Sequence, residues 1–116
     1  MVSSYRDLIV WQKAMDLVVE VYRLTRQLPK DESFGLANQI RRAAVSIPSN
    51  IAEGYSRQAP KDYSRFLAIA RGSKSEVETQ LDISVRVGCL NESDIQKAAD
   101  LCREVGSMLN AIIGKL

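Results

Sequence analysis

Polar side chains that could carry out chemistry lie along one face of the segment that contains RRAAVSIPSNIAEG. They recur at steps of three or four residues, the spacing of a single helix face, at Gln39, Arg42, Ser46, Ser49 and Glu53. In a catalytic interpretation, this face is an active-site groove in which Glu53 is a general acid or base and Arg42 binds an anion.

In a structural interpretation, the same face is a polar seam between two helices. Arg42 then pairs with Glu76 of a neighbouring helix. The serines, together with Asn50, bond to backbone that the kink at Pro48 exposes. The expected seam residues are Arg42, Ser46, Ser49, Asn50, Glu53 and Glu76. We favour this interpretation because a lone carboxylate, with no histidine in the chain and no phosphate-binding loop, makes a poor catalyst. The sequence therefore predicts no catalytic residue and no enzyme.

The chain also lacks the usual ligands of a metal or cofactor site. Without histidine it has neither the commonest zinc ligand nor the Glu-x-x-His pairs of di-iron bundles. Cys89 and Cys102 form no C-x-x-C pair, so we expect both to be buried, reduced thiols. We predict no metal and no cofactor.

Hydrophobic periodicity predicts helices over most of the chain. The first expected helix covers about residues 8–28, and the second begins between Ser33 and Leu36 and includes Tyr55. The third runs from Pro60 to about Gly88, and the fourth follows the N-cap Asn91, with Asp94 completing a weak capping box. Because short connections force neighbouring helices to run antiparallel, we predict an all-α, up-down-up-down four-helix bundle that forms a single domain over residues 1–116.

The second expected helix contains a proline. Apolar positions continue in helical register from Ile47 to Ile51, through Pro48. A loop would reset this register, so we expect one helix that is kinked at Pro48, with Gly54 and the following YSRQA as its C-terminal stop.

The short connection between the second and third helices predicts which residues face each other. With a turn near residue 58, Ser46 faces Ala70 and Ala43 faces Ser73. The facing segments RRAAVS and AIARGS are rich in small residues, which allows close backbone approach. This packing is our explanation for Gly72, since glycine otherwise destabilises a helix by about 1 kcal/mol relative to alanine.

The first expected helix carries two apolar stripes. One comprises Leu8, Trp11, Met15, Val18 and Tyr22, and the other comprises Val10, Ala14, Leu17, Val21, Leu24 and Leu28. A helix at the edge of a monomeric bundle needs only one such stripe. The additional stripe therefore predicts a contact with another copy of the chain or with a different protein.

Basic residues are concentrated in the middle of the chain, although the net charge is only +2. Residues 23–74 hold ten Lys or Arg against four Asp or Glu, whereas residues 75–116 hold four against seven. An antiparallel bundle gathers five cations at the end that carries the connection between its second and third helices, and we call this the basic end: Arg6, Arg57, Lys61, Arg65 and Lys115. It is either a phosphate-binding surface or ordinary solvated charge, diluted by Asp7 and Asp62.

The sequence shows no segment for membrane insertion or secretion. The start of the chain has no apolar core of signal-peptide length, and no apolar run elsewhere is long enough for a membrane span. We therefore expect a cytoplasmic protein with no membrane partner.

The chain resembles a known family in three segments, LIVWQKAMDLVVEVYRLT, GLANQIRRAAVSIPSNIAEGYSR and FLAIARGSKSEVETQL. The family comprises bacterial four-helix-bundle proteins, many encoded in the intervening sequences of 23S ribosomal RNA genes and often labelled 23S ribosomal proteins. The chain is also similar to the accessory variability determinant of diversity-generating retroelements. The resemblance implies a small, non-enzymatic protein that forms a ring-like homopentamer, and the retroelement relatives bind nucleic acid and a reverse transcriptase.

Three functional hypotheses follow from these observations. In the leading one, the chain is a homo-oligomeric binding or scaffolding protein in which Arg57, Lys61 and Arg65 contact the phosphates of RNA or DNA, helped by Arg6 and Lys115. A reverse transcriptase is a further partner if the chain acts in a retroelement. In the second, the protein is an adaptor that binds a different chain through the apolar stripe of its first helix. In the third, it is an enzyme such as a nuclease, built on the catalytic interpretation above.

Overall fold

The computed structural model describes residues 2–32 and 35–116, and within these ranges the chain forms helices and no strand. The α-helices are α1 (Ile9–Thr25), α2 (Leu36–Ser56), α3 (Pro60–Arg86) and α4 (Glu92–Lys115). Two short 3-10 helices, η1 (Tyr5–Asp7) and η2 (Lys30–Glu32), precede α1 and α2. None of these helices is long and apolar enough to cross a membrane. The all-α prediction is confirmed.

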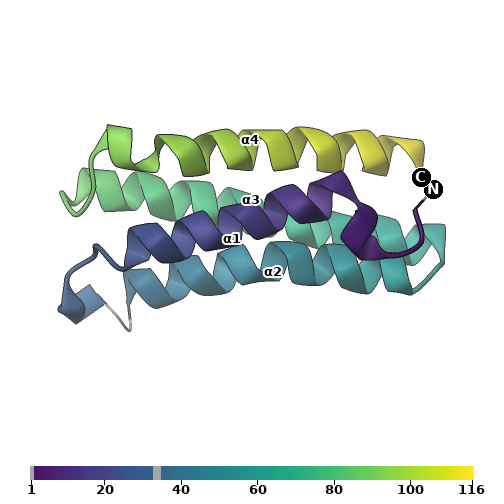
Figure 1. Ribbon diagram of the computed structural model, residues 1–116, viewed down its shortest axis with the longest axis horizontal. Coiled ribbons are helices and arrows are strands. Elements are labelled where there is room, and N and C mark those ends of the chain that lie inside the picture. Colours follow the sequence, from purple (N-terminus) through teal and green to yellow (C-terminus); the bar gives the residue numbers. More distant parts are fainter. Residues whose placement is uncertain (1, 33–34) are drawn as a thin grey trace.

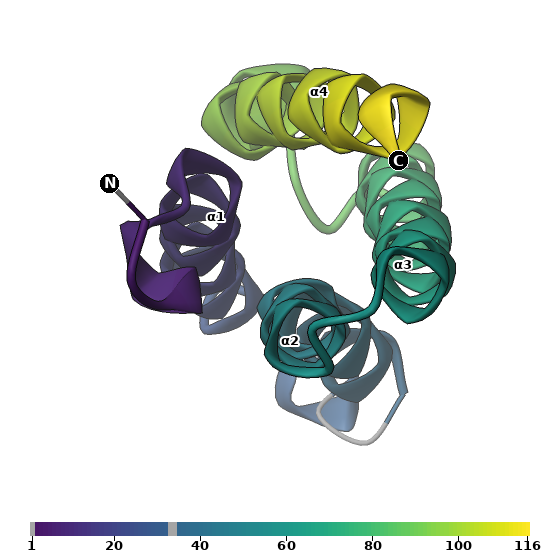
Figure 2. The same cartoon turned by 90° about the vertical axis from the view of Figure 1, so that its right-hand side faces the viewer.

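The four α-helices lie side by side along the 43 Å length of the molecule (Figure 1). Each helix packs against the next in sequence, and α4 also packs against α1, so that the four surround one core (Figure 2). The start of the described chain, the end of α4 and the α2–α3 connection lie at the same end of the molecule (Figure 1). Residues far apart in sequence therefore share this end.

Local sequence signals set several helix boundaries. Pro60 occupies the first turn of α3, where a backbone N–H would have no helical partner. The backbone N–H of Asn91 donates to the Asp94 carboxylate at 2.8 Å, which confirms the capping box at the start of α4. The expected start of α2 falls partly on Ser33, outside the described residues, and α2 begins at Leu36.

The two apolar stripes of α1 have different surroundings. One stripe is buried in the core, as its spacing predicts, at Val10, Ala14, Leu17, Val21, Leu24 and Leu28. In the other, Trp11 and Val18 pack only partly against the core, and Met15 is 39% exposed. The helix α1 therefore keeps part of a second apolar face open.

The helix α2 continues through Pro48 and Gly54 and ends at Ser56, within the stop predicted from Gly54 and the YSRQA that follows it. Gly54 is buried, and a Cβ at this position would lie 2.7 Å from Cβ of Phe66 and 3.2 Å from Cδ1 of Tyr63. No side chain larger than hydrogen fits without a shift. Gly54 therefore lets α3 approach α2 closely.

The facing residues of α2 and α3 differ from the predicted pairs by one helical turn. The Ser46 hydroxyl meets the hydroxyl of Ser73, at 2.8 Å, whereas Ala70 was expected opposite it. The reason is that helical side chains tilt toward the N-terminus of their own helix. The side chains of α2 therefore tilt away from the α2–α3 connection, and those of α3 tilt toward it. The α3 partner of an α2 residue therefore lies farther from the turn than a symmetric count predicts.

Gly72 does not take part in close packing, and the explanation given for it from sequence was wrong. It is exposed, and a Cβ at this position would have no heavy atom within 4 Å. Close approaches occur instead at Gly54 and at Gly106 of α4, where a Cβ would lie 3.0 Å from Cε of Lys74.

The variant Gly54→Ala should lower the free energy of unfolding by about 1–3 kcal/mol, because its methyl group overlaps the Phe66 side chain in a packed contact. The matched variant Gly72→Ala should raise it by up to about 1 kcal/mol, since alanine favours a helix and meets open space there. Urea unfolding followed by circular dichroism, at equal protein concentrations, measures both. If Gly54→Ala were as stable as the unchanged chain, the close approach of α2 and α3 would be contradicted.

Candidate functional site

A small hydrogen-bonded cluster joins α2 to α3 beside Pro48. The hydroxyls of Ser46 and Ser73 lie 2.8 Å apart. The Asn50 side-chain amide donates to the Ser46 carbonyl at 2.8 Å and to its hydroxyl at 2.9 Å. Ser73 is only 6% exposed, so these bonds replace contacts that its hydroxyl loses with water. Of the six expected seam residues, Ser46 and Asn50 thus hydrogen-bond at the contact between α2 and α3.

Arg42 and Glu76 line a polar cleft between α2 and α3. The cleft has a volume of about 270 Å³ and is lined by Gln39, Arg42, Ala43, Ser46, Ser73, Glu76 and Gln80. Both charged side chains are exposed, and among the described residues neither forms an ion pair. The pair expected between them is therefore absent, and the two charges remain solvated.

The other two seam residues lie away from this contact. Ser49 lines a groove on the side of α2 that faces α1. Glu53 is exposed and accepts a hydrogen bond from Nε of Arg57 at 3.2 Å. The polar stripe of α2 is thus divided among the α3 contact, the α1 groove and the basic end. Its members do not converge on one point, as the groups of an active site must.

Two free cysteines have different exposure: Cys102 is buried and Cys89 is half-buried. Burial raises the pKa of the Cys102 thiol to about 12; nearby Glu78 adds to this rise, and Lys74 opposes it. Cys102 is therefore a protonated thiol at neutral pH and not a nucleophile. The part of the chain that the structure describes also contains no cluster of three or more cysteine, aspartate or glutamate side chains that could hold a metal ion.

Two cations of the basic end share one aromatic ring. The guanidinium groups of Arg57 and Arg65 lie 4.9 Å and 4.5 Å from the ring centroid of Phe66. Contacts of this kind hold a guanidinium group in place through the electron-rich face of the ring. Glu53, paired with Arg57, offsets part of the positive charge.

The other three cations come from the segments that meet at the same end. Arg6 lies in η1 with its guanidinium 4.8 Å from the Tyr5 ring centroid, Lys61 lies in the first turn of α3, and Lys115 is the last residue of α4. The start of the described chain, the start of α3 and the end of α4 lie at one end of the molecule (Figure 1). The structure therefore places all five cations at one end of the molecule.

A hollow that was not expected from sequence opens at the basic end. This end hollow has a volume of about 370 Å³ and is lined by Ser3, Tyr55, Gln58, Ala59, Pro60, Tyr63 and Leu116. The rings of Tyr55 and Tyr63 meet edge to face, with centroids 5.9 Å apart and an interplanar angle of 82°. Both tyrosines occupy apolar positions of the helical pattern, which predicts them in the core. The signal in the sequence was Gly54, whose missing side chain makes room for Tyr63.

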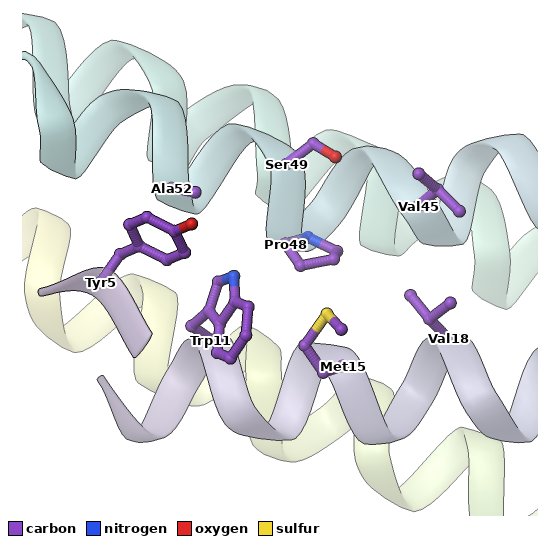
Figure 3. Close-up of a pocket in the computed structure, with 8 residues that line it drawn as sticks. All are labelled: Tyr5, Trp11, Met15, Val18, Val45, Pro48, Ser49 and Ala52. Carbon is purple, nitrogen blue, oxygen red and sulfur yellow. The ribbon is translucent and has the colours of Figure 1, made fainter. Parts of the chain in front are cut away.

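An apolar groove runs along the flank of the molecule between α1 and α2 (Figure 3). This flank groove has a volume of about 350 Å³ and is lined by Tyr5, Trp11, Met15, Val18, Val45, Pro48, Ser49 and Ala52. Trp11 and Met15 of α1 face Pro48 of α2, and Val18 lies opposite Val45 (Figure 3). The open stripe of α1 is thus continuous with apolar residues of α2.

Comparison with known proteins gives a matching family model and similar solved structures. The model of the family described as 23S rRNA-intervening sequence protein matches residues 6–111. A crystal structure of a protein of unknown function, from the S23 ribosomal protein family of Bacteroides thetaiotaomicron VPI-5482, is similar with a TM-score of 0.84 and 25% sequence identity. The match covers 90% of this chain and 98% of that chain. No curated protein matches the chain.

Iodoacetamide at mildly basic pH should modify Cys89 much faster than Cys102. The Cys102 thiol has a pKa of about 12, so only a minute fraction is thiolate, and burial also blocks the reagent. Mass spectrometry of peptides after timed labelling measures the two rates, and labelling in concentrated urea, where both rates should become similar, is the control. Equal rates in the folded protein would show that Cys102 is not buried.

Proposed function

The chain belongs to the 23S rRNA-intervening sequence protein family, and from this premise we propose that it is a non-enzymatic, homo-oligomeric scaffold that binds RNA or DNA through its basic end. Five copies in a ring is the assembly that the family resemblance implies. A reverse transcriptase is a further partner in a retroelement setting.

The observation that carries the nucleic-acid proposal is the arrangement of cations at the basic end. Arg57 and Arg65 both lie close to the ring of Phe66. Lys61, which lies between them in sequence, is in the first turn of α3. Cations on one surface bind a phosphate backbone largely because they release its condensed counterions. Contacts to phosphates carry no sequence information, so we propose binding with little sequence preference.

The absence of catalysis is also part of the proposal. Glu53, the one general base that the sequence offered, lies exposed and paired with Arg57, away from Arg42 and the polar cleft. A solvated ion pair provides neither the convergent groups nor the water exclusion that catalysis needs. We therefore assign Ser46, Asn50 and Ser73 a structural role.

We propose that the flank groove receives another copy of the chain. Its walls are apolar on both helices, and its members Met15 and Val45 remain exposed. Apolar side chains that are exposed together mark association surfaces on soluble proteins. The groove also coincides with the second stripe of α1, which the sequence pattern predicts to make a further contact.

In our proposal, the helices of the bundle alternate in direction, and the second of them bends. We propose an up-down-up-down course of the helices, supported by the short α2–α3 and α3–α4 connections and by the packing of α4 on α1. We also propose a bend at Pro48, because proline cannot donate to the Ala44 carbonyl.

A second candidate function is a protein adaptor that uses the same flank groove for a different chain. The open groove favours it as well, and the basic end would then be solvated charge. The two functions differ in assembly, since only a monomer keeps its groove free for a foreign partner.

Nucleic-acid binding should weaken as salt rises, and replacing Arg57, Lys61 and Arg65 together by alanine should flatten this dependence. Each lost phosphate contact lowers the slope of log affinity against log salt by about one unit, so the triple variant should lose about three. Fluorescence anisotropy with labelled RNA and DNA at several salt concentrations measures the slope.

The matched control replaces Arg26, Lys30 and Arg86, which are exposed cations away from the basic end, by alanine. It removes the same charge and should leave the slope close to that of the unchanged chain. Affinity that does not fall with salt, or equal losses in both triple variants, would refute a binding surface at the basic end.

Met15→Glu should dissociate the assembly, because association through the flank groove would bury an unpaired carboxylate. Size-exclusion chromatography with light scattering should give an oligomer for the unchanged chain and a smaller species for the variant. Val87→Glu, at a position that is 60% exposed and outside the groove, is the control and should assemble normally. A monomeric unchanged chain would favour the adaptor function.

A further inference from the structure

The end hollow has features that phosphate binding alone does not require. Its volume of about 370 Å³ lies within the range of small-ligand pockets, and two aromatic rings line it. A phosphate-binding surface needs cations but no concave aromatic wall. We propose that the end hollow binds one unpaired base of a single-stranded nucleic acid. This inference rests on the proposed function and narrows it to strands with unstacked bases.

The two tyrosines provide the stacking surface. Tyr55 comes from the last turn of α2 and Tyr63 from the first turns of α3, and each is only half-buried, so part of each ring stays open. Since the rings are nearly perpendicular, a flat base on one ring meets the edge or face of the other. Aromatic side chains hold unpaired bases in this way with little regard to sequence. Ala59, Pro60 and Leu116 complete the apolar wall.

Gln58 adds a hydrogen-bonding side chain to the wall of the hollow. Its φ of 57° lies in the left-handed region, which residues other than glycine rarely adopt. Glycine would make the same turn between α2 and α3 without strain. The chain instead holds there a side-chain amide that lines the hollow and can both donate to and accept from the edge of a base.

Three cations adjoin the residues that line the hollow. Arg57 precedes Gln58 in sequence, Lys61 follows Pro60, and Lys115 precedes Leu116. A base in the hollow would therefore have its flanking phosphates near positive charge. A duplex keeps its bases stacked inside and can use only the cations. The hollow thus distinguishes single strands from duplexes.

The proposal is tested by measuring binding affinity at low salt by fluorescence anisotropy. The ligands are oligothymidylate and oligouridylate, and each is compared with a duplex of equal length. Tyr55→Ala should weaken binding of the single strands about tenfold and leave duplex binding unchanged, as expected for one lost stacking contact. Tyr55→Phe keeps the ring and should bind nearly as well as the unchanged chain. Circular dichroism and light scattering confirm that each variant folds and assembles alike.

Two further measurements do not depend on the alanine variant. A single 2-aminopurine base within oligothymidylate should lose fluorescence on binding to the unchanged protein, because stacking on an aromatic ring quenches it. Gln58→Gly should raise the midpoint of thermal unfolding by relieving the left-handed residue, and yet bind the single strand more weakly. A merely structural role for Gln58 would leave binding unchanged.

The outcomes separate the pocket from the proposed function. If the Arg57, Lys61 and Arg65 variant loses binding while Tyr55→Ala binds single strands normally, the pocket is refuted and the proposed function stands. Equal losses on duplex and single strand, or unchanged 2-aminopurine fluorescence at saturation, also refute the pocket. If no oligonucleotide binds the unchanged protein at low salt, both proposals fall.

Discussion

The close approach of α2 and α3 at Gly54 is the constraint on which the basic end depends. With only hydrogen as its side chain, Gly54 allows Phe66 and Tyr63 to lie against the backbone of α2. Phe66 then sits where Arg57 and Arg65 can both reach its ring, and Tyr63 sits beside Tyr55. Charged and aromatic side chains of two helices thus take their positions from one backbone contact.

A second contact fixes how α2 and α3 are aligned along their lengths. Small residues allow helices to approach but also to slide, since alanine surfaces look alike at every turn. The hydroxyl pair of Ser46 and Ser73, with the Asn50 amide bonded to it, is directional and largely withdrawn from water. A slide by one turn would separate these groups and leave buried polar atoms without partners. The polar cluster therefore sets the alignment that Gly54 needs in order to meet Phe66.

Much of the fold could be predicted from sequence because helical periodicity reports directly on burial. The stripe from Val10 to Leu28, the continuation of α2 through Pro48 and the cap at Asn91 all depend on residues close in sequence. The placement of the five cations at one end needed only the order of the helices and their short connections.

Features that depend on neighbours across space could not be predicted in this way. Gly54 and Gly72 look alike in sequence, and only the presence or absence of a facing side chain separates their roles. Tyr55 and Tyr63 fit the apolar pattern as core residues, although their rings line an open hollow. The pairing of Ser46 with Ser73 followed from the tilt of side chains along each helix, which a count of residues from the turn leaves out.

The flank groove and the end hollow face different directions, one along the side of the bundle and the other at its tip. Copies that associate side by side around an axis would therefore display their tips in parallel, spaced by a bundle only 20–24 Å across. A flexible strand bound at the basic end of one copy would encounter the basic end of the next copy at an effective concentration of about millimolar. Its overall affinity for the assembly would therefore far exceed its affinity for one copy. Residence time on such an assembly would then increase with strand length, a form of selectivity that no single subunit possesses.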